Sequence, residues 1–310
     1  MQNRRKFIKL PPSNKRWGFI LPNKKIFHAL VLLLVVIVAT VLSYVLTRPV
    51  RYAVFAGYNK DGVIEPYVVT YLKGLDEVCD GIVYIADSNL KEGEEKKLYG
   101  INILHMEHKR HNEYDWGSYK RGYVWLRDKG YLDKADKLIL ANDSTYAPIS
   151  SFKPMFKEMG ENKNIGFWGN SLAMYGVPHI QSYFMVFRKE VFNDKGFEEF
   201  ILSIKHQEEH FDYVRKYEME FTQYLRGKGY YYKSYLPKVG KVDSEDILAN
   251  PSIYPLEYIK KYQNQFIKRK FFLSTEIKNG DLTGELLEYL EKNHKRTYDD
   301  IKMSGVIKNI

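Results

Sequence analysis

The sequence predicts an α/β fold, a three-layer α/β/α domain in which helices cover both faces of a mostly parallel central sheet. The main observation is alternation. Between residues 52 and 187, short apolar runs typical of buried strands alternate with segments that carry apolar residues at helical spacing. No internal repeat or low-complexity segment interrupts this pattern. With 310 residues and 45% hydrophobic content, the chain can bury one sizeable core, so we expect one main domain.

The individual elements follow from the local pattern. Apolar runs predict strands at residues 52–56, 81–86, 101–105, 137–141, 165–168 and 181–187. Helical spacing predicts helices at residues 65–78, 117–129 and 152–159, with a short exposed helix at 91–99. Trp116, Tyr119 and Trp125 have the spacing of aromatic residues that fill helix–sheet interfaces, so we expect them in the core and not in contact with a ligand.

The amino-terminal segment differs from the rest in charge and hydropathy. Residues 1–25 form a basic tail without acidic residues, and they hold most of the net charge of +10. Residues 26–47 contain no charged residue, and a helix of this length reaches about 33 Å, enough to cross a bilayer core. A cleaved signal peptide has a shorter apolar core. The sequence therefore predicts a single transmembrane anchor, and the positive-inside rule places the amino terminus in the cytoplasm.

Composition excludes several classes of site. Beyond the tail, basic and acidic residues are mixed, so a nucleic-acid partner that binds through a basic face has little support. The single cysteine, Cys79, excludes an internal disulfide and a cysteine metal cluster, and it is expected to be a small buried residue after a helix.

Two polar segments indicate a ligand site. Asn142, Asp143 and Ser144 directly follow an expected strand, which puts a carboxylate at the carboxyl end of the sheet, where open α/β folds bind ligands. The alternative interpretation of this segment is an ordinary Asx turn or helix cap. Residues 110–117 form a second polar and aromatic cluster just before an expected helix.

Several stretches together resemble the rhamnan synthesis protein F family of glycosyltransferases, and they run in family order over most of the chain after residue 50. They are Ala53-Val-Phe-Ala-Gly-Tyr-Asn-Lys-Asp-Gly62, Arg110-His-Asn-Glu-Tyr-Asp-Trp-Gly-Ser-Tyr119, Leu138-Ile-Leu-Ala-Asn-Asp-Ser144, Phe167-Trp-Gly169, Pro178-His-Ile-Gln-Ser-Tyr-Phe184, Tyr217-Glu-Met-Glu-Phe-Thr222 and Asn250-Pro-Ser252.

The resemblance implies a GT-A-like glycosyltransferase domain at residues 51–275, with a helical extension at 276–310. It also implies transfer of a sugar, rhamnose or a related hexose, from a nucleotide-sugar donor to a growing cell-surface polysaccharide or other glycan, which can be lipid-linked. Asp143 then occupies the place of the Asp-x-Asp metal motif of such enzymes, and its ion would be Mg²⁺ or Mn²⁺, because carboxylate and phosphate oxygens suit hard cations.

The donor pocket is expected to draw on the same two polar segments and on the end of the first strand. Arg110 suits phosphate oxygens and Asp115 suits ribose hydroxyls or the base, whereas Gly117 permits close backbone approach at a helix start. The alternative for Asp115 is a helix cap, and for Asp61 a simple chain turn. The full set of expected donor-binding residues is Asp61, Arg110, Asn112, Tyr114, Asp115, Gly117, Asn142 and Ser144.

The remaining candidates concern the acceptor. Glu218 matches the family's Tyr-Glu pair and is the candidate catalytic base, whereas Glu220 points elsewhere on the same helix and is expected to be solvated. His179 is a second catalytic candidate, with a structural role beside Pro178 as its alternative. Gln181 and Ser182 suit hydrogen bonding to acceptor hydroxyls.

Two other functions stay open at this point. A membrane-tethered protein could keep the fold and bind or assemble glycans without turnover, because only one carboxylate occupies the metal segment. A metal-dependent hydrolase has less support, because clustered His and Asp ligands are missing from the sequence. The side of the membrane on which the body lies is also open, since positive-inside flanks predict an exported body whereas bacterial nucleotide sugars are cytoplasmic.

Overall fold

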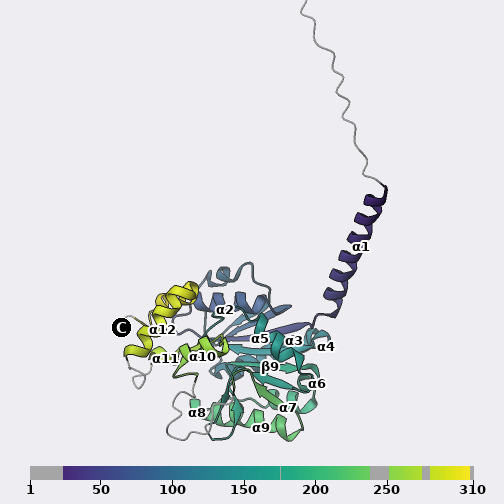
Figure 1. The fold of residues 1–310 in the computed structure, drawn as a ribbon. Coiled ribbons are helices and arrows are strands. Elements are labelled where there is room, and N and C mark those ends of the chain that lie inside the picture. Colours follow the sequence, from purple (N-terminus) through teal and green to yellow (C-terminus); the bar gives the residue numbers. More distant parts are fainter. Residues whose placement is uncertain (1–23, 175, 238–250, 274–279, 308–310) are drawn as a thin grey trace, which may run out of the picture. The chain divides into compact units, whose positions relative to one another are not determined.

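A computed structural model describes residues 24–174, 176–237, 251–273 and 280–307. Asn250 of the last matched stretch and nearly all of the basic tail lie outside the described residues. The chain divides into two compact units, Met1–Arg48 and Pro49–Ile310. In the first unit, α1 spans Lys24–Thr47 (Figure 1). Within the described part of the chain, no helix combines the length and the apolar character needed to cross a membrane, so the anchor expected at residues 26–47 is not supported.

The second unit is built on a seven-stranded sheet in the order β10-β6-β9-β4-β1-β2-β3. Strand β9 runs antiparallel to its neighbours β4 and β6, and the other neighbouring strands pair in parallel. The mostly parallel sheet expected from the sequence is therefore confirmed. The strands are β1 (Arg51–Gly57), β2 (Gly81–Ala86), β3 (Ile103–His108), β4 (Lys137–Asn142), β6 (Phe167–Gly169), β9 (Phe184–Arg188) and β10 (Tyr232–Ser234).

Two short strand pairs lie outside this sheet. Strand β5 (Thr145–Tyr146) pairs antiparallel with β11 (Ile267–Lys268), and β7 (Leu172–Ala173) pairs antiparallel with β8 (His179–Ile180). Both pairs lie near the edge of the sheet where β4 ends and β9 begins.

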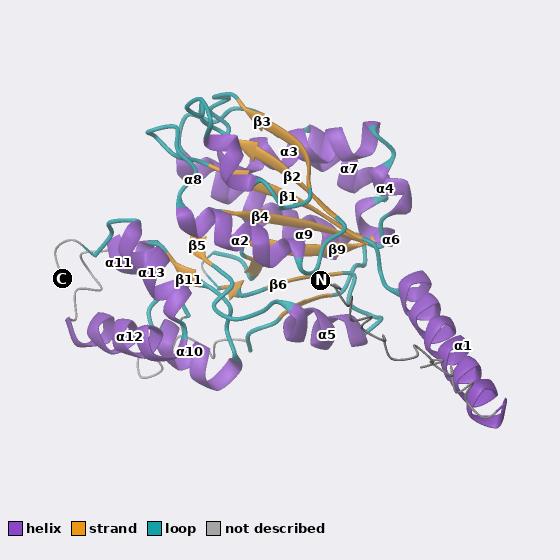
Figure 2. Cartoon of the chain, turned by 90° about the horizontal axis from the view of Figure 1, so that it is seen from above, coloured by secondary structure: helices purple, strands orange, loops and turns teal. Residues whose placement is uncertain are grey.

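Helices cover both faces of the sheet, as Figure 2 shows. Alternate residues of β1 point to opposite faces, with Phe55 in one core cluster and Val54 in the other. The first cluster includes side chains of α2 (Pro66–Asp76), the 3₁₀ helix η1 (Glu94–Leu98), α5 (Lys153–Glu161), α10 (Pro255–Tyr262), α11 (Lys270–Leu273), α12 (Gly280–Asn293) and α13 (Lys295–Met303). The second includes α3 (Tyr114–Asp128), α4 (Tyr131–Lys134), α6 (Lys189–Phe192), α7 (Lys195–Leu202), α8 (His210–Tyr213), the π-helical turn η2 (Val214–Met219) and α9 (Glu220–Gly227).

Local patterns located most elements within a few residues. The strand expected at 81–86 has those bounds, and Trp116 and Tyr119 are buried in the core as expected. Trp125 is partly buried, and its ring stacks between those of His105 and Tyr131. The third strand is shifted toward the carboxyl terminus, to Ile103–His108, where its register with β2 contains an irregularity.

The carboxyl-terminal extension packs into the domain. Leu286 and Leu290 of α12 and Ile301 of α13 are fully buried in the first core cluster. These helices, yellow in Figure 1, therefore complete one face of the body.

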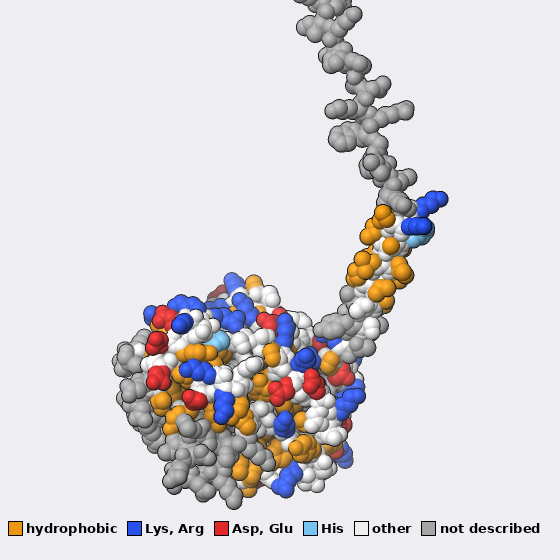
Figure 3. Space-filling view, in the orientation of Figure 1, with side chains coloured by type: hydrophobic (Ala, Val, Ile, Leu, Met, Phe, Trp, Pro, Cys, Tyr) orange, Lys and Arg blue, Asp and Glu red, His pale blue; other side chains and the backbone are white. Residues whose placement is uncertain are grey.

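The body's charges are mixed on the face that Figure 3 shows. There, lysine and arginine side chains are interspersed with aspartate and glutamate. This face offers no continuous basic surface of the kind that tracks a nucleic-acid backbone.

Candidate functional site

A cavity of about 790 Å³ opens where β1, β2 and β4 end. The strands are parallel, and Ala56 lies beside Asn142 in the β1–β4 register, so the residues that follow these strands meet at one edge of the sheet. Many of the residues expected from the sequence line this cavity. They are Arg110, Tyr114, Asp115, Asn142, Asp143, Ser144, His179, Gln181, Ser182 and Glu218.

The turn after β4 is held by the Asn142 side chain. Its Oδ1 accepts hydrogen bonds from the Ser144 N–H at 3.1 Å and the Ser144 hydroxyl at 2.6 Å. Its Nδ2 donates to Asp115 Oδ2 at 2.8 Å. The segment is therefore both an Asx turn and part of the cavity wall. The Asn142 amide forms its hydrogen bonds with other residues of the protein. It holds the Asp143 turn next to Asp115, and its expected contact with the donor stays a prediction.

Asp143 is fixed by backbone groups of two elements. Its Oδ2 accepts a hydrogen bond from the Tyr58 N–H at 2.7 Å, and its own N–H donates to the Ala56 carbonyl at 3.2 Å. Burial raises the pKa of the Asp143 carboxyl to about 7, against the lowering effects of the Tyr58 hydrogen bond and the nearby Arg269. A desolvated carboxylate of this kind gains from a cation placed against it.

A divalent cation fits this position only with oxygens from a ligand. In the part of the chain that the structure describes, no group of three His, Cys, Asp or Glu side chains is arranged to hold a metal ion. Mg²⁺ and Mn²⁺ are commonly held by one or two carboxylates together with substrate phosphates and water. Asp143 can supply the protein carboxylate of such a site.

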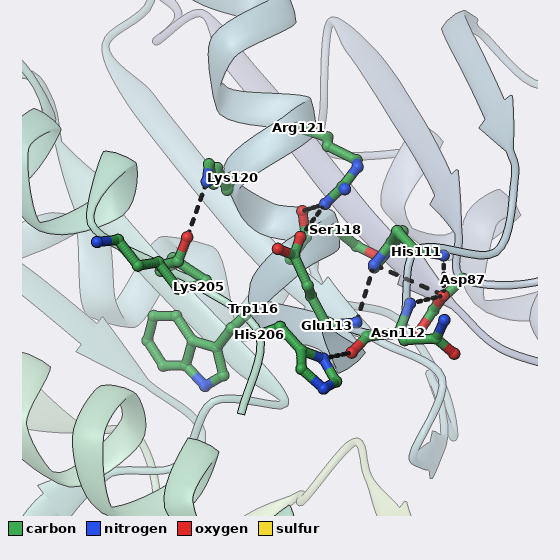
Figure 4. A network of polar contacts seen from close by, with 12 residues as sticks. Asp87, His111, Asn112, Glu113, Trp116, Ser118, Lys120, Arg121, Lys205 and His206 are labelled. Atoms are coloured by element: carbon green, nitrogen blue, oxygen red, sulfur yellow. Dashed lines mark hydrogen bonds and ion pairs between the residues drawn. The ribbon is translucent and has the colours of Figure 1, made fainter. Parts of the chain in front are cut away.

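Asp87, which the sequence analysis missed, organises the loop at residues 110–112 (Figure 4). Its Oδ1 accepts hydrogen bonds from the N–H groups of His111 at 2.6 Å and Asn112 at 2.9 Å. Arg110 donates to the Asp87 carbonyl at 2.7 Å, and the Arg110 guanidinium lies 4.8 Å from the centre of the Tyr58 ring. A signal for Asp87 was present, because it directly follows a strand just as Asn142 and Asp143 do.

Two residues of this loop have left-handed backbone conformations. Asn112 has a φ of 58° and Tyr114 a φ of 53°, which are uncommon for residues other than glycine. The Asn112 carbonyl accepts hydrogen bonds from His206 Nδ1 at 2.8 Å and the Tyr213 hydroxyl at 3.3 Å. Tyr114 is 45% exposed, lines the cavity, and contacts the rings of His210 and Tyr213.

Three expected donor-binding residues lie outside the cavity lining. Asp61 is exposed in a turn in which its N–H bonds to Asn59 Oδ1 at 2.9 Å, as its alternative interpretation held. Asn112 acts through its backbone. Gly117 is not at the helix start, because its N–H already bonds to the Glu113 carbonyl; a side chain there would overlap Glu113, so the glycine serves internal packing.

The acceptor side of the cavity holds two carboxylates linked by Ser182. Glu218 Oε1 accepts the Ser182 N–H at 3.1 Å, and Glu218 Oε2 lies 3.2 Å from the Ser182 hydroxyl. The same hydroxyl lies 3.3 Å from Asp115 Oδ2. Burial, followed by the charge of Glu218, raises the pKa of the Asp115 carboxyl. Ser182 therefore holds both oxygens of Glu218, and its expected contact with the acceptor stays a prediction.

His179 stands beside this pair. Its Nδ1 lies 2.6 Å from the Val177 carbonyl, which can only accept, so Nδ1 carries a proton. In the neutral ring Nε2 is then an acceptor, 3.8 Å from Glu218 Oε1. Gln181 Oε1 accepts a hydrogen bond from the Ser171 hydroxyl at 2.7 Å. Glu220, by contrast, is exposed, as expected.

Lys268 and Lys270 also line the cavity, and sequence reasoning did not find them. They arrive through the pairing of β11 with β5, which follows the Asp143 turn directly, and the Arg269 N–H donates to the Ser144 carbonyl at 2.9 Å. A two-residue strand gives no readable pattern in the sequence.

The model of the family described as "Rhamnan synthesis protein F" matches residues 82–306. The chain belongs to this family. The resemblance seen in the sequence is thereby confirmed, and the match extends over the carboxyl-terminal helices. A curated relative, "Uncharacterized protein y4gN" of Sinorhizobium fredii, is 25% identical over 153 residues, which cover 48% of this chain and 39% of the relative. The chain thus spans about two fifths of that relative's length.

Solved structures with similar folds include two glycosyltransferases. The mannosyltransferase PcManGT from Pyrobaculum calidifontis, in complex with GDP-Man and Mn²⁺, is 10% identical, with 84% of this chain and 74% of that chain covered and a TM-score of 0.41. A glycosyltransferase that acts in glycosylation of the major capsid of PBCV-1 is 12% identical, with 70% and 94% covered and a TM-score of 0.39. Similarities at this level assign neither substrate nor residue role to this chain.

Proposed function

We propose that this protein is a glycosyltransferase that moves a sugar, rhamnose or a related hexose, from a nucleotide-sugar donor to a growing cell-surface polysaccharide or other glycan. The proposal is carried by one observation: a single cavity contains a strand-end carboxylate, Asp143, and a second carboxylate, Glu218, whose two oxygens are both held by Ser182. Membership of the rhamnan synthesis family supports the class of sugar.

The chemistry needs a base for the acceptor and a place for the leaving diphosphate. Glu218 takes the proton of an acceptor hydroxyl while that oxygen forms a bond to the anomeric carbon of the donor sugar. The bond between that carbon and the phosphate oxygen breaks, and its electron pair leaves with the nucleoside diphosphate. His179 Nε2 lies 3.8 Å from Glu218 Oε1, so an acceptor hydroxyl that reaches this oxygen also lies near His179. A single displacement of this kind inverts the anomeric centre.

The donor side is formed by the ends of β1, β2 and β4. Arg110, held by Asp87 and lying over the Tyr58 ring, offers a guanidinium for phosphate or base oxygens. Asp143 would hold a Mg²⁺ or Mn²⁺ ion, which would supply positive charge to neutralise the diphosphate. The exposed Ser144 lines the cavity next to this carboxylate.

Substitution of the proposed base tests the function. The full chain is incubated with Mn²⁺, a panel of nucleotide sugars that includes activated rhamnose, and glycan acceptors, and both nucleotide release and the glycan product are measured. We expect Glu218→Gln to lower kcat by about 100-fold or more with donor affinity retained. Glu220→Gln is the matched control, because Glu220 is exposed two residues away.

A non-catalytic glycan-binding protein is the competing function, and the single carboxylate of the Asp143 turn favours it. Nucleotide release that is missing for every donor, together with retained glycan binding, would establish that alternative in place of the transferase.

We also propose, on the charge of residues 1–25 alone, that the amino terminus is cytoplasmic. Protease treatment of intact cells carrying a tagged carboxyl terminus tests where the body lies. Digestion of the tag from outside would exclude a cytoplasmic body.

A further inference from the structure

Lys268 is a cation in the cavity wall whose only printed side-chain contact, among the described residues, is with an aromatic ring. Its Nζ lies 3.9 Å from the centre of the Tyr183 ring, and among the described residues it has neither a hydrogen-bond acceptor nor an ion-pair partner. Burial lowers the pKa of the Lys268 ammonium to about 8. An ammonium on a ring face keeps N–H donors on the side away from the ring, and these are available for a ligand.

The protein fixes the position of Lys268 from two directions. Its backbone pairs with Thr145, two residues beyond Asp143, in the β11–β5 ladder. The ring beneath it is itself anchored, because the Tyr183 hydroxyl bonds to Asn170 Nδ2 at 2.8 Å and lies 2.7 Å from the Ser171 hydroxyl. A cation whose position is restricted in this way is preorganised to stabilise negative charge that develops on a nearby ligand atom.

Lys268 is related to both sides of the cavity. Its backbone is beside the Asp143 turn, whereas the carboxylates whose charge acts on its ammonium are those of Glu218 and Asp115. In the proposed reaction, the bond between the anomeric carbon and the leaving phosphate lies between a base and a metal-binding carboxylate. Lys268 lines the same cavity as the proposed base and the proposed metal-binding carboxylate.

The two basic residues that follow Lys268 in the sequence have different surroundings. Lys270 lines the cavity with Lys268, whereas the Arg269 guanidinium turns away to the Tyr67 ring at 4.9 Å and to Glu65 at 3.8 Å. Four carboxylates and three Lys or Arg side chains line the cavity, so it is not a general trap for anions. An anion that binds in this cavity is therefore held by individual Lys or Arg side chains and not by the overall charge of the cavity.

We propose that Lys268 binds the diphosphate of the donor and that its ammonium stabilises the negative charge on the leaving phosphate, with Lys270 as a second, more exposed contact. This inference rests on the proposed glycosyl transfer. It assigns to a residue of β11 a share in the task that the proposed function gives to Arg110 and the Asp143 site. Charged hydrogen bonds to transferring phosphates are a general means of accelerating such reactions.

Binding of inorganic pyrophosphate to the full chain tests the subsite directly. Calorimetric titrations are made with and without Mn²⁺ on the wild type, Lys268→Met, Lys268→Arg and Lys260→Met. Lys260 is the matched control, because its ammonium lies 5.1 Å from the centre of a tyrosine ring, that of Tyr289, outside the cavity lining. We expect Lys268→Met to raise the Kd about 10- to 100-fold, Lys268→Arg to retain most of the affinity, and Lys260→Met to match the wild type.

Thermal unfolding of each variant shows whether the fold is kept. If Lys268→Met melts like the wild type and binds pyrophosphate equally well, the proposal is overturned. If Lys268 instead binds the phosphate of a lipid-linked acceptor, Lys268→Met would lower the affinity for a short-chain prenyl phosphate and leave pyrophosphate binding unchanged. That result also overturns the proposal.

Transfer assays separate this inference from the function beneath it. With an active donor, Lys268→Met should lower kcat by about 100-fold, because the charge on phosphate increases as the bond breaks. Suppose that the wild type transfers sugar and that Lys268→Met binds pyrophosphate as well as the wild type does. This outcome would overturn the Lys268 subsite and leave the glycosyltransferase function standing. Pyrophosphate binding that depends on Lys268, without transfer from any donor, would count against the glycosyltransferase and leave the anion subsite in place.

Discussion

Glu218 and Asp143 are two carboxylates in one cavity with different surroundings. Both oxygens of Glu218 accept hydrogen bonds from Ser182, which orients the group toward the space beside His179. Asp143 accepts one hydrogen bond from the Tyr58 N–H, and burial raises the pKa of its carboxyl to about 7. Such a difference suits one group to proton transfer and the other to binding a cation.

His111 is the residue whose titration should be visible in stability. Its Nδ1 accepts the Glu113 N–H at 3.2 Å, so Nε2 carries the proton toward Ser118 at 3.0 Å, and the ring is neutral. Burial, and next the charge of Arg121, lower the pKa of His111 from 6.5 to about 4. The neutral ring's contribution to stability is therefore fully present above pH 6.5 and is lost as the pH falls toward 4.

We expect the free energy of unfolding to fall by an amount on the order of 1–3 kcal/mol between these pH values because of His111. The His111→Leu variant should be less stable at neutral pH but should show a shallower slope over this range. Urea unfolding at several pH values measures both slopes. Equal slopes for the variant and the wild type would mean that His111 does not carry the acid sensitivity.

At the scale of elements, the close packing of α3 on the sheet positions the Arg110 loop and Asp115. Gly122 lies against Val54 of β1, and a methyl group at this position would overlap the valine side chain. The helix thus approaches the sheet as closely as its backbone allows. Its first turn, which carries Asp115, is thereby held beside Asn142.

Gly122→Ala should accordingly destabilise the protein by about 1–3 kcal/mol, because the overlap forces α3 away from β1. Gly227→Ala is the control, since a methyl group there has open space within 4 Å and alanine favours a helix. Thermal unfolding compares the two. A Gly122→Ala variant as stable as Gly227→Ala would contradict the close packing of α3 on β1.

For the body as a whole, the carboxyl-terminal helices complete one face of the core. Leu290 of α12 is fully buried, in the same cluster as Phe55 of β1 and Tyr71 of α2. The helical extension expected at residues 276–310 therefore shares its hydrophobic core with the domain expected at 51–275. Removing an apolar side chain from this extension should weaken the entire body.

Leu290→Ala should lower the free energy of unfolding by about 2–5 kcal/mol in a single transition. Glu288→Ala, on the same helix but exposed, should have little effect. Denaturant unfolding followed by tryptophan fluorescence reports on the change, because Trp116 and Trp168 are buried in the body. An early separate transition in Leu290→Ala would show that α12 unfolds independently of the sheet.

The sequence by itself determined the class of fold, the position of the strands nearest the site, and the Asp143 turn. These features depend on short-range patterns: apolar runs of strand length, and a polar residue directly after a strand. The same rule applied to the strand at 81–86 would have found Asp87. Trp116 and Tyr119 were assigned to the core because helical spacing fixes which residues share a face.

Only the tertiary structure decided how these parts meet. The role of Gly117 depends on its contact with Glu113, and that of Asn142 on Asp115, which comes from a different element. Lys268 reaches the cavity through a two-residue strand that pairs with residues more than a hundred positions earlier. Such pairings are selected by the packing of the entire core, so no local pattern records them, and the Lys268 cation in the candidate site became visible only in the folded chain.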